Sequence, residues 1–299
     1  MNDRAKGLFF AITAAALYGL NPLFAVPLYG QGMKPASVLS FRYLLAAAFL
    51  VCFMLIQRIS LRLSRRQALW LFLFGILFAL SSQLLFEAYQ WMDVGLASAL
   101  IFVYPVIVTV FMALFFHEKM TPSIVTSLCM AVCGVFLLSG GGTSSSMSAF
   151  FIVLLSAFTY AGYLIGIRET CVKELHATVL TFYTLMFGFT VFAASIMLKD
   201  GIQCPQNAAG WGLVCCSAFL CTTLSAASVA LAIRYVGPTA TSILGALEPV
   251  TGVLIGVFVF GEILTWANIA GIVLIILAVT LLVAVKPLMH MLRYGRRRY

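Results

Sequence analysis

Ten apolar stretches of about 20 residues follow one another along this chain, and they limit its fold more than any other feature. A helix rises ~1.5 Å per residue, so about 20 apolar residues cross the ~30 Å hydrocarbon core of a bilayer. Composition agrees, because 63% of the 299 residues are hydrophobic and only 9% are charged, too few to cover a water-facing surface. The chain is therefore predicted to be an integral membrane protein.

The expected spans are helices, since the alternating pattern of barrel strands is absent and helices are the other solution that satisfies every backbone group inside lipid. We expect an all-α integral membrane protein with ten transmembrane helices, and an uncleaved first span, because its apolar run is longer than a signal-peptide core. The predicted spans cover residues 7–28, 36–57, 68–90, 95–116, 120–139, 148–167, 177–198, 211–233, 239–260 and 266–285.

The basic residues predict the orientation. An even number of spans leaves both termini on one side, and Lys and Arg favour the cytoplasm. Cytoplasmic termini put two basic residues outside, Lys34 and Lys199, leave Arg42 within a span, and put these fifteen inside: Arg4, Lys6, Arg58, Arg62, Arg65, Arg66, Lys119, Arg168, Lys173, Arg234, Lys286, Arg293, Arg296, Arg297 and Arg298. We predict a multi-pass protein of the cell inner (plasma) membrane, its cations facing lipid headgroups. The closing YGRRRY is interpreted as a membrane anchor, and no nucleic-acid partner is expected.

The chain contains an internal repeat. ASVLSFRYL at 36–44 is similar to ATVLTFYTL at 177–185, and VGLASALIFVYP, ending at Pro105, corresponds to VGPTATSILGALEP, ending at Pro249. Five spans per half is an odd number, so the second half enters the membrane from the opposite side, as an inverted repeat. The predicted division is a first five-helix repeat at 1–139, a Gly/Ser linker at 140–147, a second repeat at 148–285 and a basic cytoplasmic tail at 286–299.

These motifs resemble those of the drug/metabolite transporter superfamily, in its EamA-like branch. The resemblance rests on the five-plus-five spans, on the first span AAALYGLNPLF, and on YPVIVTVFMALFFHE and EPVTGVLIGVFVFGE, each with its proline near the middle of a span and an acid at the end. It covers about 7–285, with one departure, since Tyr18-Gly19 stands where many relatives have Trp-Gly. The resemblance implies an alternating-access carrier, often an exporter, for small metabolites such as amino acids. Carriers with similar motifs move unrelated cargo, so the substrate stays open.

Ionisable residues inside a bilayer are costly, so each is a functional candidate. Glu248 lies near the middle of the ninth span, where its carboxylate can bind a cationic group or carry a proton, or can instead be a structural acid. Arg42, toward the outer side of the second span, can bind a cargo carboxylate or a resident acid. Gln83, Glu87 and Gln90 share one face of the third span. An Arg42–Glu87 ion pair closing the outer side is the alternative to cargo contact for both residues.

Polar and aromatic residues near the midplane complete the candidate site. Tyr18 with Asn21, and Tyr160 with Tyr163, have the same spacing at equivalent places in the two halves. Together with Tyr104 they can line a cavity, with rings for apolar cargo and hydroxyls for polar groups, or pack between helices. Pro105 and Pro249 are candidate hinges, because each removes the hydrogen bond to the carbonyl four residues earlier, at Ile101 and Gly245 respectively.

The functional prediction is a secondary active transporter, an exporter of an amino acid or a related zwitterionic or amphipathic compound. The preference for amino acids rests on the expected mixed charge of the cavity, one Arg with two Glu. The alternatives are a facilitative carrier of other cargo, such as a nucleoside, sugar or drug, and a membrane-embedded transferase. The expected partners are a small-molecule substrate and lipid. No metal site or cofactor is expected, because the three histidines are far apart in sequence. Both a monomer and a homodimer stay open.

Overall fold

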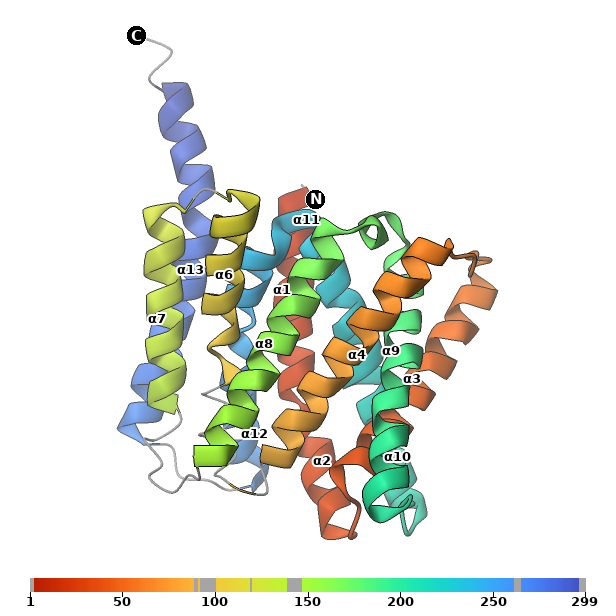
Figure 1. Ribbon diagram of the computed structural model, residues 1–299. Coiled ribbons are helices and arrows are strands. Elements are labelled where there is room, and N and C mark those ends of the chain that lie inside the picture. The colour runs from red at the N-terminus through yellow and green to blue at the C-terminus, as the bar shows by residue number, and fades with distance from the viewer. Residues whose placement is uncertain are drawn as a thin grey trace.

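The computed structural model describes residues 3–88, 91, 101–118, 120–138, 147–260 and 265–295. The described part is a bundle of tilted helices and contains no strand (Figure 1). Six of its helical stretches are long and apolar enough to cross a bilayer, and four further apolar helices of 10–17 residues accompany them. The prediction of an all-α multi-pass membrane protein is confirmed.

The helices of the first half follow the predicted spans within a few residues, apart from the breaks described below. Residues 95–100 of the fourth span, as well as Gln90, Glu262 and linker residues 140–146, lie outside the described residues. The helices are α1 (Asp3–Gly19), α2 (Asn21–Gly30), α3 (Pro35–Ile56), α4 (Arg65–Ala88), α6 (Tyr104–Phe116) and α7 (Pro122–Leu138).

The described part of the second half contains α-helices and two π-helical segments. The π-helical segments are η2 (Ile196–Asp200) and η3 (Ser217–Leu224), and η1 (Cys171–Glu174) is a short 3₁₀ turn. The α-helices are α8 (Met147–Glu169), α9 (Ala177–Ser195), α10 (Ala208–Cys216), α11 (Ser225–Leu244), α12 (Leu247–Phe260) and α13 (Trp266–Gly295).

The first and ninth spans are interrupted, whereas the sequence predicted each as one helix. The first is divided into α1 and α2, with Pro22 at the start of α2. The ninth is divided between the end of α11 and α12, just before Pro249. A proline has no N–H to donate to the preceding turn, but it is well tolerated in the first turn of a new helix. Both prolines therefore begin a second piece of helix inside a span.

The helix contacts have the two-fold pattern that inverted repeats require. Helix α4 packs on α8 and α9, as its second-half counterparts α11 and η3 pack on α1 and α3. Helix α6 packs on α8 as α12 packs on α1. The two self-equivalent pairs, α3 with α9 and α7 with α13, are also in contact. Two inverted five-helix units account for every one of these pairs.

The start of α1 and the end of α13 lie on one face of the bundle, at the top of Figure 1, which we call the terminal face. The opposite face carries the α2–α3 turn and the loop before α10. These segments join the halves, because Gln203 N–H donates to Ser37 Oγ at 3.0 Å and Gln206 Nε2 donates to the Gln31 carbonyl at 2.9 Å. The shared face of the termini agrees with an even number of spans.

Candidate functional site

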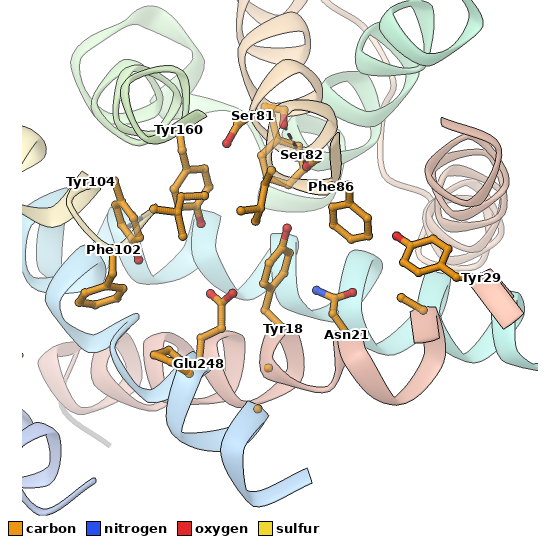
Figure 2. A pocket seen from close by; sticks show the side chains of 17 residues that line it. Tyr18, Asn21, Tyr29, Ser81, Ser82, Phe86, Phe102, Tyr104, Tyr160 and Glu248 are labelled. Carbon is orange, nitrogen blue, oxygen red and sulfur yellow. Dashed lines mark hydrogen bonds between the residues drawn. The ribbon is translucent and has the colours of Figure 1, made fainter. Parts of the chain in front are cut away.

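A cavity of about 230 Å³ lies between the two halves (Figure 2). Its walls come from α1, α2, α4, the segment leading into α6, α8 and α12, and it extends toward the opposite face past Tyr29 and Phe86. The described residues that line it are Tyr18, Gly19, Asn21, Ala25, Tyr29, Phe78, Ser81, Ser82, Leu85, Phe86, Ile101, Phe102, Tyr104, Tyr160, Glu248, Pro249 and Gly252. We call it the central cavity.

A much smaller cavity, of about 30 Å³, continues from the central cavity toward the terminal face. Both cavities are lined by Tyr18, Phe78, Tyr104, Tyr160 and Glu248, which we call the waist. A space of this size holds about two water molecules, not a metabolite. The central cavity is therefore closed to cargo on the terminal side, immediately beyond the waist.

The break before α12 places Glu248 at the waist. Pro249 cannot donate to the Gly245 carbonyl, but the N–H of Glu248 donates to that oxygen at 2.9 Å. The sequence predicted that the Gly245 carbonyl would lose its hydrogen bond. A tighter turn provides this carbonyl with a donor three residues later instead of four. Helix α12 begins at Leu247, so Glu248 lies in its first turn, where the positive end of the helix dipole favours an acid.

A close helix approach brings Tyr18 beside Glu248. A Cβ atom at Gly19 would lie 2.6 Å from the Glu248 carbonyl oxygen and 2.6 Å from Thr251 Cβ, closer than any side chain can pack. Glycine at this position lets α1 contact α12 directly. The neighbouring Tyr18 consequently points into the cavity next to the carboxylate (Figure 2).

Tyr104 occupies the equivalent of Glu248 in the first half and makes a structural contact. Its hydroxyl donates to the Ser242 carbonyl at 3.3 Å, at the end of α11. Its ring meets that of Tyr160 edge to face, with the centroids 4.8 Å apart. A Cβ atom at Gly245 would overlap the hydroxyl of Tyr104. Tyr104 therefore fastens the first half to the break in the second.

The Glu248 carboxylate points into the central cavity, beside Tyr18 (Figure 2). Within the described residues no hydrogen bond or ion pair reaches this carboxylate, and no Lys, Arg or His lines the cavity. A carboxylate removed from water is costly unless a cation or a proton neutralises it. The cavity thus presents one acidic group within an aromatic wall.

Asn21 provides a second polar group on the same side. It is 8% exposed, and in the described part of the chain its Oδ1 atom has no hydrogen-bond partner. Figure 2 places it between Tyr18 and Tyr29. This amide can accept a hydrogen bond from a bound molecule several atoms away from the group that meets Glu248.

The two remaining candidate tyrosines, Tyr160 and Tyr163, differ in the cavity that they line. Tyr160 lines both cavities, and Tyr163 lines the smaller one. Their rings are stacked with centroids 6.1 Å apart, and Phe78 lies against Tyr163 at 4.8 Å. Tyr163 is only 1% exposed, which makes it a wall of the closed side.

Arg42, Gln83 and Glu87 do not line either cavity. Arg42 is 2% exposed and donates from Nε and Nη2 to Thr222 Oγ1 at 3.3 and 3.1 Å. Gln83 Nε2 donates to Glu87 Oε1 at 2.9 Å. No ion pair joins Arg42 to Glu87 among the described side chains. The mixed-charge cavity expected from the sequence is therefore corrected to a cavity with a single carboxylate.

The face of α4 that lines the cavity was missed by the sequence reading. It consists of Phe78, Ser81, Ser82, Leu85 and Phe86, whose spacing of three, four, seven and eight residues from Phe78 is that of one helical face. The more polar stripe at Gln83 and Glu87 lies on the adjacent face of the same helix, outside the lining of either cavity. The helical spacing of these residues could have identified the face that lines the cavity. The prediction followed polarity instead and selected the adjacent face.

The model of the EamA-like transporter family matches residues 5–140 and, a second time, residues 147–284. The chain belongs to the EamA-like transporter family. It is accordingly a transporter rather than an enzyme, and the resemblance found in the sequence is confirmed.

The individual relatives have low sequence identity to this chain. The chain is 28% identical to the pseudopaline exporter CntI of Pseudomonas aeruginosa, in an alignment that covers 70% of this chain and 72% of that protein. It is 24% identical to the uncharacterized inner membrane transporter YicL of Salmonella typhimurium, over 94% of this chain and 96% of that one. A solved crystal structure with 16% sequence identity has a TM-score of 0.81 and covers 93% of this chain and 96% of its own, which shows the shared fold.

Proposed function

We propose that this EamA-like transporter exports a small amphipathic metabolite that carries an ammonium group, such as an amino acid or a related zwitterion. It works as a secondary active carrier in the inner membrane, by alternating access. The observation that carries the proposal is the single unpaired carboxylate of Glu248 in an aromatic cavity between the inverted halves.

The chemistry of the central cavity supports an ammonium group. Glu248 offers a charge-assisted hydrogen bond, and the tyrosine and phenylalanine rings around it offer cation–π contacts. The aromatic wall fits an apolar body, and Asn21 can accept a second hydrogen bond. A zwitterion would place its carboxylate away from Glu248, toward hydroxyl and amide donors, since no basic residue of the described lining is available to it.

The fold supports alternating access and the direction of transport. Inverted repeats are nearly equivalent, so closing one side and opening the other is the expected exchange between two states. The distribution of basic residues supports a cytoplasmic terminal face, and the central cavity extends away from that face. CntI is an exporter and YicL is an inner membrane transporter by name, which supports export across the inner membrane.

A panel of probes that share one ring and differ in charge tests the recognition. Phenethylamine carries an ammonium group, phenylalanine an ammonium and a carboxylate group, and hydrocinnamate only a carboxylate group. We expect the first two to raise the melting temperature of the purified protein in detergent and hydrocinnamate to leave it unchanged, because binding to the folded state stabilises it.

Two variants separate the site from the rest of the chain. Glu248→Gln should strongly reduce the stabilisation by both ammonium probes, whereas Glu174→Gln, an exposed acid on the terminal face, should keep it. Stabilisation by hydrocinnamate equal to that by phenethylamine, or an undiminished effect in Glu248→Gln, would contradict the proposed function.

A further inference from the structure

We propose that a separate cavity on the terminal face binds the phosphate headgroup of an anionic phospholipid from the surrounding bilayer. This cavity has a volume of about 690 Å³ and lies between the ends of α6 and α8, η1, the start of α9, and α11 (Figure 1). We call it the terminal-face cavity. The inference does not depend on the cargo, because none of the described residues of this cavity lines the central cavity.

The terminal-face cavity follows from a difference between the two halves. Pro22 comes after Asn21, and Leu164 comes after the equivalent Tyr163. Pro22 begins α2, and α2 packs on both α12 and α3. Leu164 is compatible with a continuous helix, so α8 runs on to Glu169 and packs on α4, α6 and α11. The space between α12 and α3 is therefore filled by α2, whereas the equivalent space between α6 and α9 contains the terminal-face cavity.

The terminal-face cavity lies at the depth of lipid headgroups. Phe116 in its wall lies about 18 Å along α6 from Tyr104 of the waist, at ~1.5 Å per residue. Half of a hydrocarbon core measures about 15 Å, so a waist near the midplane puts Phe116 at the boundary between acyl chains and headgroups. The end of α6 faces the bilayer, since Leu114, Phe115 and Phe116 are 68%, 64% and 43% exposed. A lipid can thus reach the cavity from the side.

The charged residues of the terminal-face cavity come from several segments. Arg168 lies at the end of α8, Lys173 in η1 and Arg234 in α11. Two acids, Glu118 and Glu169, also line the cavity, so the three bases leave one positive charge in excess. The phosphate of a phospholipid such as phosphatidylglycerol carries one negative charge and would balance it.

The two acids of the cavity already have partners. Oε2 of Glu118 accepts a hydrogen bond from Thr239 Oγ1 at 2.8 Å. Oε1 of Glu169 lies 3.6 Å from Nε of Arg168. No ion pair reaches the other two bases of the cavity among the described side chains. A bound anion would therefore meet cations that have no acidic partner.

Arg234 is fixed in position and keeps further donors. Its Nη2 atom donates to the carbonyls of Lys173 and Leu175, in η1 and directly after it. A guanidinium also carries N–H donors on Nε and Nη1, which remain for an acceptor in the cavity. Phosphate oxygens suit a donor group held in this way, because little ordering is needed when the bond forms.

Arg168 reaches from α8 to the break in α11. Gly237 at that break has a φ of +86°, and a Cβ atom there would lie 2.6 Å from Nη1 of Arg168. Glycine at this position therefore leaves the room that the guanidinium occupies. The charge of Arg168 is held at the wall of the cavity, although its side chain is 47% exposed.

The apolar part of the lining favours a lipid over a free phosphate ion. Met112, Ile167, Leu180 and Ile233 line the cavity on the side nearer the membrane interior, beyond the basic residues. A headgroup among the bases, with the start of an acyl chain on these side chains, matches both parts of the lining. Inorganic phosphate would use only the basic part.

Short-chain lipids test the site on the purified protein in detergent. The probes are dioctanoyl phosphatidylglycerol, dioctanoyl phosphatidylcholine, which has the same acyl chains and a phosphate but no net charge, and inorganic phosphate. We expect phosphatidylglycerol to raise the melting temperature most, because a ligand that binds the folded chain stabilises it. Inorganic phosphate at the same concentration should leave the melting temperature unchanged.

Variants locate the binding. Arg168→Gln and Lys173→Gln should each weaken the binding of dioctanoyl phosphatidylglycerol by about 2- to 5-fold, as expected for an exposed ion pair. Lys173→Arg keeps the charge and should bind as wild type, and so should Arg66→Gln, which changes an exposed base at the start of α4. Titration of the melting temperature with lipid measures the affinities, and circular dichroism establishes that each variant is folded.

Three outcomes would overturn the proposal. Equal stabilisation by the two lipids would show that the negative charge is not recognised. An equal effect of inorganic phosphate would make the free ion the ligand in place of a lipid. Undiminished binding to a folded Arg168→Gln, Lys173→Gln double variant would show that the lipid binds elsewhere. Each outcome leaves the binding of phenethylamine untouched, so the proposed function is judged separately.

Discussion

Tyr104 and Glu248 occupy equivalent positions in the two halves, each immediately before a proline at the start of a helix. Tyr104 donates a hydrogen bond to the Ser242 carbonyl, and Glu248 presents an unpaired carboxylate to the central cavity. The same backbone arrangement thus positions a structural hydrogen bond in the first half and a candidate cargo-binding group in the second. The prolines belong to the shared architecture, whereas the charge distinguishes the halves.

A second pair of equivalent positions shows the same division. Arg42 of α3 donates to Thr222, and Tyr183 of α9, at the corresponding place in the repeat, donates to the Leu61 carbonyl at 2.9 Å. Both bonds fasten a helix to a neighbouring segment. Arg42 and Tyr183 therefore contribute to the scaffold, and neither lines the central cavity.

The largest effect is expected at the waist. Glu248→Gln should weaken the binding of phenethylamine by roughly 10- to 100-fold, because a hydrogen bond to a charged group contributes about 1.5–3 kcal/mol and each ~1.4 kcal/mol is a factor of ten. Isothermal titration calorimetry measures the change. Tyr104→Phe, at the equivalent position, should change the affinity only a few-fold, and equal losses in the two variants would break the distinction between them.

The next effect concerns the bonds of α3 and α9. Thr222→Val leaves the buried Arg42 guanidinium without that partner and should lower the free energy of unfolding by about 1–3 kcal/mol. Tyr183→Phe removes a bond between neutral groups and should cost about 0.5–1.5 kcal/mol. Both are measured by denaturation in detergent. The affinity for phenethylamine should stay unchanged in Thr222→Val. A loss of affinity would indicate that Arg42 takes part in cargo binding.

The fit between Tyr104 and Gly245 gives a third test. Gly245→Ala introduces a Cβ atom that overlaps the hydroxyl of Tyr104, and overpacking of this kind costs about 1–3 kcal/mol. Adding Tyr104→Phe removes the overlapping hydroxyl, so the double variant should be more stable than Gly245→Ala alone. A double variant whose loss equals the sum of the single losses would show that the two residues do not press on one another.

The membrane orientation of the chain can be tested by chemical labelling, which requires no change in stability or affinity. Cys204 is exposed on the opposite face, and Cys171 lies in η1 on the terminal face. In variants that retain one of these cysteines, a membrane-impermeant maleimide added to spheroplasts should label Cys204 and spare Cys171. The reverse pattern would place the termini outside the cytoplasm.

The sequence indicated which polar residues occupy the middle of a predicted span, but not the direction in which each side chain points. Apolar runs and the internal repeat place Glu248, Tyr18 and Tyr160 near the midplane, where they line the central cavity. They do not fix the rotation of a helix about its axis, because apolar side chains surround helices in lipid and in the core alike. Packing decides the rotation, and it turns Gln83 and Glu87 away from the cavity while Ser81, Ser82 and Phe86 face it.

The most direct measurement is a structure with bound para-bromophenethylamine, in which the anomalous signal of bromine fixes the position of the ring. The account predicts that the ring lies in the central cavity and that the nitrogen is within hydrogen-bond distance of the Glu248 carboxylate. A bromine position in the cavity of about 690 Å³ near Arg168 and Arg234, with the central cavity empty, would contradict it.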